Sequence, residues 1–177
     1  MKLEYKMDEQ DFLDFQMFAA SQSVRIKRKM LRGWMFITLG FGVMSVFFFL
    51  ECSILTAIYF GVVAIIGGLF YPRFFRWRYK RHYKAHIREN YSNRFEDSEY
   101  IEINDETIFC KSKSGEGTIN TSQIEKIDET EKHFFVKIKT GVSLIIPKYK
   151  IHNQDEVRAK FEFLGFSVSK IINKKCK

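Results

Sequence analysis

The chain has 177 residues and a formal net charge of +8, a size that predicts one or two structural units. Its basic excess is concentrated: eleven Lys and Arg residues, more than the whole net charge, lie on the two sides of one apolar stretch. This arrangement argues against a nucleic-acid-binding protein, which carries basic residues along one face of a folded domain.

The N-terminal arm, residues 1–32, is predicted to form a short strand and then an amphipathic helix. Apolar and polar residues alternate over positions 3–7, as is typical of a strand. Asp8 can cap the helix that follows, and Asp11 stands three residues later. We expect this helix to continue through the first basic cluster into the apolar stretch.

The apolar stretch, residues 33–72, predicts a transmembrane hairpin. Its only formal charge is Glu51, near the middle, and a helix needs about 20 mainly apolar residues to cross a bilayer. The polar residues Glu51, Cys52 and Ser53 mark a turn between crossings at 34–50 and 54–71. A cleaved signal peptide fits poorly, because a second apolar run follows at once. The remaining alternative is that these residues form the buried centre of a water-soluble globule.

Basic residues flank both ends of the hairpin, as the positive-inside rule expects of cytoplasmic segments. An even number of crossings returns the chain to its starting side, so we expect a multi-pass cell-membrane protein with both termini in the cytoplasm. The same residues are candidates for binding anionic lipid headgroups: Arg25, Lys27, Arg28, Lys29, Arg32, Arg73, Arg76, Arg78, Lys80, Arg81 and Lys84. The last six lie in residues 73–90, which are predicted to continue the second crossing as a basic juxtamembrane helix.

Small residues recur at helical spacing in both crossings and predict the face through which the two helices pack. They are Gly33, Gly40, Ala57, Gly61, Ala64 and Gly68. A homodimer through the same face is an alternative. Neither crossing carries a charge away from the turn, which counts against a pump or transporter.

Residues 91–169 are predicted to form a small antiparallel β-barrel or two packed sheets, closed by a C-terminal helix. Short strands and turns alternate up to Pro147, which has no N–H and ends an apolar edge strand, with Lys148 discouraging further pairing. Asn153 is expected to cap the final helix and Gly165 to end it. A basic tail, residues 170–177, follows.

The order of these elements resembles the YcxB-like family of bacterial membrane proteins. The resemblance rests on Gly117-Thr118-Ile119, on residues 124–130 (IEKIDET), on Phe134-Phe135-Val136 and on residues 144–148 (LIIPK). The family often has Trp just before the position of Ile124, where this chain has Thr121-Ser122-Gln123. The resemblance implies a pleckstrin-homology-like (PH-like) cytoplasmic domain in an α+β membrane protein, and it transfers no catalytic residue.

The functional expectation is a membrane-anchored, non-enzymatic binding or regulatory module without a cofactor or metal. Its partners would be anionic lipid and a protein that binds the PH-like domain. Two alternatives stay open: a protein of antimicrobial-peptide immunity or envelope stress, and a membrane enzyme, for which His133 with Asp128 and Glu129 is the candidate cluster. We also expect residues 89–177 to fold alone, unless the strand at 3–7 completes their sheet.

Overall fold

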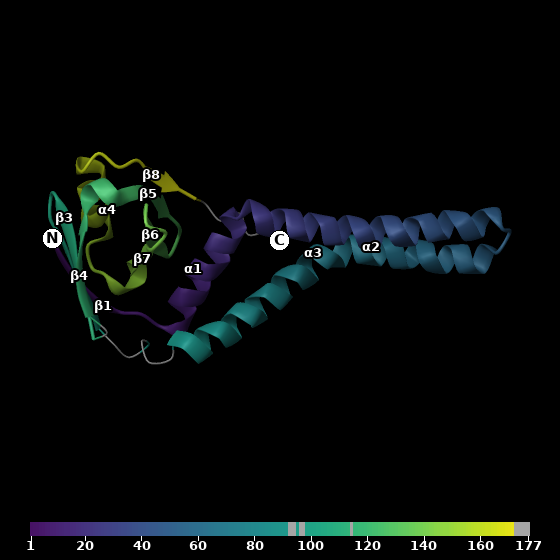
Figure 1. The fold of residues 1–177 in the computed structure, drawn as a ribbon, viewed down its shortest axis with the longest axis horizontal. Coiled ribbons are helices and arrows are strands. Elements are labelled where there is room, and N and C mark those ends of the chain that lie inside the picture. Colours follow the sequence, from purple (N-terminus) through teal and green to yellow (C-terminus); the bar gives the residue numbers. More distant parts are fainter. Residues whose placement is uncertain (92–94, 96–97, 114, 172–177) are drawn as a thin grey trace. The chain divides into compact units, whose positions relative to one another are not determined.

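The computed structural model describes residues 1–91, 95, 98–113 and 115–171 of the chain (Figure 1). The chain divides into two compact units. The first, here called the sheet unit, combines Met1–Phe15 with Ile87–Lys177; the second, the helical unit, is Gln16–His86. Most of the predicted basic tail, with Cys176, lies outside the described residues.

Three helices occupy the first half of the chain: α1 (Glu9–Gln22), α2 (Val24–Leu50) and α3 (Ile54–Tyr91). The prediction that the first helix runs unbroken into the apolar stretch is wrong, because a break at Ser23 separates α1 from α2. Ser23 has an extended backbone, and its side chain accepts a hydrogen bond from the Ile26 amide at 3.4 Å. It therefore acts as the N-cap of α2.

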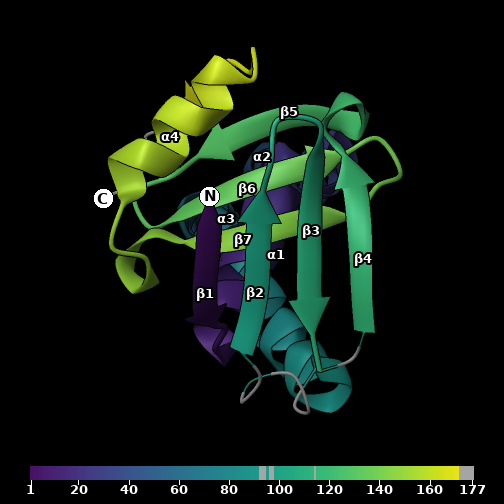
Figure 2. The same cartoon turned by 90° about the vertical axis from the view of Figure 1, so that its left-hand side faces the viewer.

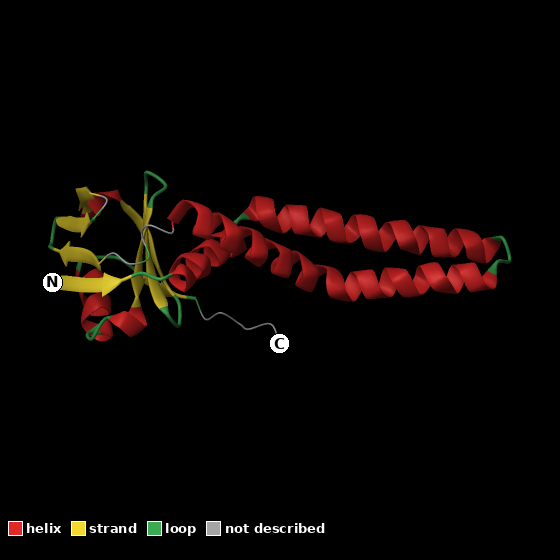
Figure 3. Cartoon of the chain, turned by 90° about the horizontal axis from the view of Figure 1, so that it is seen from below, coloured by secondary structure: helices red, strands yellow, loops and turns green. Residues whose placement is uncertain are grey.

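Helices α2 and α3 run antiparallel and side by side over their apolar parts (Figure 3). They contain both predicted crossings and meet at the predicted turn, where Cys52 adopts a left-handed φ of 61°. As the sequence predicts, α3 continues through Pro72 into the basic segment.

The described residues of the sheet unit form two four-stranded sheets. The first has the order β1-β2-β3-β4 and the second β7-β6-β5-β8. All strand pairs are antiparallel except β5 with β8, which is parallel. The strands are β1 (Lys2–Lys6), β2 (Ser98–Ile103), β3 (Thr107–Ser112), β4 (Gly115–Asn120), β5 (Ile124–Glu129), β6 (His133–Ile138), β7 (Ser143–Pro147) and β8 (Val168–Lys170).

Of the two predicted arrangements, the closed barrel is wrong and the pair of sheets is correct. Figure 2 shows the strands of the second sheet crossing behind those of the first, and no strand pairing among the described residues joins the sheets. One link between them is the Tyr5 hydroxyl on β1, which donates to the Ile145 carbonyl on β7 at 2.6 Å. Fully buried side chains from both sheets, such as Ile101 and Val136, form the core.

The N-terminal strand completes the first sheet, which answers the question that the sequence leaves open. β1 pairs with β2 over five residues, from Lys2 opposite Glu102 to Lys6 opposite Ser98. The predicted cap at the start of α1 is confirmed and is reciprocal. The Asp11 amide donates to the Asp8 carboxylate, and the Asp8 amide donates to the Asp11 carboxylate.

Helix α4 (Gln154–Phe163) follows the second sheet, at the predicted place. Its Val157 and Phe161 are fully buried, and the Phe161 ring contacts Phe134 of β6. The predicted cap at Asn153 makes no capping hydrogen bond; its side chain donates to Glu156 instead. Gly165, with a φ of 83°, stands just after the helix, as predicted.

Candidate functional site

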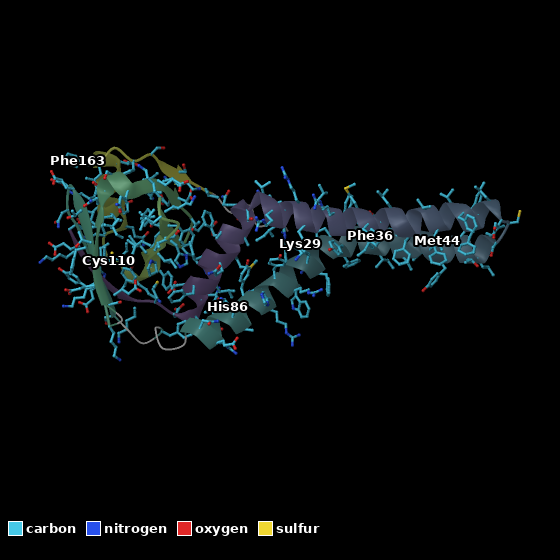
Figure 4. All side chains as sticks on the ribbon, viewed as in Figure 1. Lys29, Phe36, Met44, His86, Cys110 and Phe163 are labelled. Carbon is cyan, nitrogen blue, oxygen red and sulfur yellow. The ribbon has the colours of Figure 1, made fainter. Side chains whose placement is uncertain are left out.

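The helical unit carries most of the exposed large apolar side chains in the described chain. All of them except Val142, Tyr149 and Phe163 lie on α2 and α3. Such side chains project from both helices along their length (Figure 4). Both helices are long and apolar enough to cross a membrane, and almost none of their apolar residues is buried. Within the described chain these helices are therefore not the buried core of a globule.

Aromatic rings and small residues hold α2 against α3. Phe60 of α3 stacks on both Phe41 and Phe48 of α2, with ring centroids 6.1 and 5.4 Å apart. The Ser45 hydroxyl donates to the Ala57 carbonyl of the other helix at 2.7 Å. In a bilayer, packing and interhelical hydrogen bonds of this kind hold helices together.

A single hydrogen bond stabilises the hairpin where proline interrupts α3. A residue at position 72 would normally donate its N–H to the carbonyl of Gly68, but Pro72 has no N–H. The indole N–H of Trp34, on α2, donates to this carbonyl at 2.8 Å. Trp34 thus replaces the donor that α3 lacks, and the absence of a side chain on Gly68 lets α2 approach.

We expect Trp34→Phe to weaken the hairpin by about 1 kcal/mol, because the ring is kept while the carbonyl of Gly68 loses its donor. Reversible unfolding of the full chain in bicelles measures the effect. Trp77→Phe, on the exposed side of α3, is the matched control and should change little. In a Pro72→Ala background residue 72 supplies its own N–H, so Trp34→Phe should cost clearly less. An equal cost in both backgrounds would contradict this role.

The predicted small residues differ in their surroundings. A side chain on Gly33 would collide with Tyr71, one on Gly61 would lie 3.1 Å from Ser45, and one on Gly68 would lie 3.1 Å from Thr38. Ala57 is buried and Ala64 half-buried, whereas a Cβ on Gly40 would meet no described atom within 4 Å. Sequence reasoning missed Gly67, where an added Cβ would lie only 2.9 Å from Ile37; its place beside Gly68 in a Gly-Gly pair was the available signal.

The eleven predicted basic residues are all exposed and lie at one end of the hairpin. Five precede the contact between Gly33 and Tyr71 on α2, and six follow it on α3. Aromatic rings at every fourth position contact one another in a continuous row along the same part of α3: Tyr71, Phe75, Tyr79 and Tyr83. Arg81 also lies 5.7 Å from the Trp77 ring. Basic and aromatic side chains therefore form one band next to the apolar surface.

In the sheet unit, the buried carboxylate of Asp11 is the centre of an ionic network. His133 Nε2 lies 2.7 Å from Asp11 Oδ1, the Tyr149 hydroxyl donates to the same oxygen at 2.6 Å, and Lys150 Nζ donates to Oδ2 at 2.7 Å. Burial raises the pKa of Asp11, but these hydrogen bonds outweigh it and hold that pKa well below its usual range. The carboxylate joins α1 to β6 and to the turn after β7.

A second buried carboxylate, Glu129 on β5, joins that strand to α4. It accepts hydrogen bonds from Lys148 Nζ at 2.6 Å and from Arg158 Nε at 2.9 Å. Burial opposes the charge, yet these hydrogen bonds lower the pKa of Glu129. Every buried side-chain N or O atom in the described residues has a partner, so both networks are complete.

These networks change the interpretation of three predicted residues. His133, the centre of the candidate enzyme cluster, is only 2% exposed and contacts Asp11, whereas Asp128 pairs with Lys126. The candidate enzyme cluster therefore does not assemble around His133. β7 is an edge strand that ends at Pro147, as predicted. Lys148, however, is buried and donates to Glu129, so it does not discourage further strand pairing at this edge.

The sequence model of the YcxB-like protein family matches residues 103–161. The match begins at the last residue of β2 and ends at the buried Phe161 of α4. The resemblance predicted from the sequence is therefore confirmed over this part of the sheet unit. Neither the curated proteins nor the solved structures contain a match to the chain.

Proposed function

We propose that this protein is a membrane-anchored, non-enzymatic binding module at the inner face of a bacterial membrane. In this proposal α2 and α3 cross the membrane as a hairpin, and both termini lie in the cytoplasm. The sheet unit then binds a partner at the membrane. The observation that carries the proposal is the continuous exposed apolar surface of the hairpin, which is unfavourable in water and favourable in lipid.

The charge distribution supports the proposed orientation. The basic and aromatic band lies at the end where α2 begins, and Glu51 lies in the turn at the other end. Basic residues favour the cytoplasmic side, and aromatic rings favour the boundary between lipid and water. Each basic residue near an anionic surface contributes roughly 1 kcal/mol, so the band is also the proposed contact with anionic headgroups.

The order of elements in the sheet unit supports a PH-like arrangement. The first four strands form one sheet, the next three belong to the second sheet, and α4 follows them before β8 joins the second sheet beside β5. Helix α4 contacts both sheets: Arg158 pairs with Glu129 of β5, and Lys160 pairs with Asp105 in the turn after β2. We infer that α4 covers one end of the sheet pair. Both buried ionic clusters are internally paired, which suits a structural role better than a catalytic one.

Labelling of Cys52 tests the proposed topology, because this residue is exposed in the turn of the hairpin. A variant with Cys110→Ser and Cys176→Ser retains Cys52 alone. We expect a membrane-impermeant maleimide to label it in intact cells. The matched variant adds Cys52→Ser and carries a single cysteine, introduced by Ser169→Cys near the C-terminus. In this variant labelling should require lysis of the cells. Labelling of Ser169→Cys in intact cells, or protection of Cys52 until lysis, would contradict the proposal.

A further inference from the structure

We propose that the groove between β1 and α4 binds an extended segment of a partner protein, which adds a strand to the free edge of β1. The proposal rests on the binding role suggested above and names the surface that performs it. It does not depend on membrane insertion. A failed topology test and a failed binding test are therefore distinguishable.

The groove is open and has a volume of about 860 Å³. Residues 1–4 line one side, and residues 150–153 with the outer face of α4 line the other. Figure 2 shows β1 as the outermost strand of its sheet, with α4 on the same side. The groove thus lies along a strand edge that no described strand occupies.

The hydrogen-bond pattern shows which backbone groups of β1 face this groove. Met1 and Ile103 exchange both of their backbone hydrogen bonds across β1 and β2. In an antiparallel pair such residues alternate along the strand, so Leu3 and Tyr5 also face β2. The N–H and C=O groups of Lys2, Glu4 and Lys6 point the other way, and no hydrogen bond in the described chain uses those of Lys2 or Glu4. An extended peptide can pair with these groups.

Side chains along the free edge give the incoming strand a charge order. Lys2, Glu4 and Lys6 are exposed and alternate in sign, while Leu3 and Tyr5 between them are buried. Opposite charges directly across a strand pair are favourable and like charges are unfavourable. A partner strand with the order acid, base, acid is complementary in either direction, because the order on β1 is symmetric.

The other wall of the groove selects apolar side chains at the alternate positions. Ala159 and Phe163 lie four residues apart on α4, on one helix face, and both line the groove. Phe163 is 77% exposed although it belongs to a helix that packs into a folded unit. Figure 4 shows it at the outer side of the sheet unit. The partner is therefore an extended segment that alternates apolar residues with the charges Glu, Lys and Glu.

Two synthetic peptides test this inference against the full chain in detergent micelles. Both alternate charged residues with valine; one has the order Glu, Lys, Glu and the other Lys, Glu, Lys. Fluorescence polarisation should show about a tenfold preference for the first, since three cross-strand pairs change sign. The variant with Lys2→Glu, Glu4→Lys and Lys6→Glu should reverse the preference.

Glu4→Pro tests the backbone contact separately. It removes an N–H that faces the groove and leaves the hydrogen bonds between β1 and β2 intact. The affinity for the Glu, Lys, Glu peptide should therefore fall at least as much as it does in the charge-reversed variant. Glu4→Ala keeps the N–H and should retain most of the binding. The proposal is overturned if neither peptide binds, if the wild type and the charge-reversed variant prefer the same peptide, or if Glu4→Pro binds normally. Self-association of the chain that Glu4→Pro abolishes would make a second copy the occupant and overturn it equally.

Discussion

Replacing Asp11 with asparagine is expected to destabilise the sheet unit by about 3–5 kcal/mol, the range for removing one member of a buried ion pair. The side chain of Asp11 is fully buried, and its carboxylate contacts polar groups of His133, Tyr149 and Lys150 within hydrogen-bond distance. Asparagine keeps the shape of the side chain but removes its negative charge. Its amide NH₂ group would also face the donors that now bind the carboxylate. Because native domains are stable by only about 5–15 kcal/mol, this is a large part of the total.

Hydrogen exchange of the full chain in micelles measures the loss in the strands of the second sheet. Amides that exchange only through global unfolding should exchange roughly a hundred to a few thousand times faster in the variant. Asp14→Asn is the matched control, because Asp14 lies on the same helix and, among the described residues, accepts only from Gln10 in an exposed contact. Equal protection in Asp11→Asn and Asp14→Asn would show that the network contributes little.

The same variant should also lose part of the pH dependence of stability. The pKa of Asp11 is lowered by folding, so its contribution is fully present above about pH 4, where the unfolded carboxylate is ionised. That contribution is lost as the pH falls toward the lower pKa of the folded state. The stability difference between the wild type and Asp11→Asn should therefore narrow on acidification below about pH 4.

Local sequence patterns were sufficient to predict the elements whose apolar residues follow one simple pattern, either a continuous run or a regular alternation. The apolar stretch with one charge at its centre predicts two helices and their turn, and α2 and α3 meet at Glu51 to Ser53. Short alternating runs likewise predict β1, β2 and β6. In β1, burial follows the apolar residues of the alternating run, whereas in α2 and α3 the length of the apolar run was itself the signal.

The features that could not be predicted, namely the buried ionic networks and the short strand β8, depend on partners that are distant in sequence. Asp128 and Glu129 are buried on β5, and ion pairs with Lys126, Lys148 and Arg158 make this burial tolerable. From the local sequence alone, acidic residues are expected to be exposed on the surface. β8 has only three residues and is held by its parallel pairing with β5. The ionic centre at Asp11 was missed for the same reason, because His133 is 122 residues away.

Deleting residues 1–88 is expected to unfold the sheet unit, because the N-terminal strand completes its sheet, which is the exception that the sequence allows. The structure assigns Met1–Phe15 to this unit. The deletion removes β1, exposes the edge of β2, and leaves His133 and Lys150 without Asp11. It also removes five buried apolar side chains before Phe15, namely Leu3, Tyr5, Met7, Phe12 and Leu13. Each is worth roughly 1.5–3 kcal/mol, so their sum approaches or exceeds the stability of a domain.

Removing only the helical unit should have the opposite result. In the matched deletion variant a flexible Gly/Ser linker of about 15 residues, which spans roughly 20 Å on average, replaces Gln16–His86. We expect a soluble, strand-rich protein with dispersed amide resonances, because both segments of the sheet unit remain and the exposed apolar helices are gone. Residues 89–177 alone should give the narrow dispersion of an unfolded chain. If those residues folded by themselves, β1 and the Asp11 network would be accessories to the domain, and the energetic role assigned to them above would be wrong.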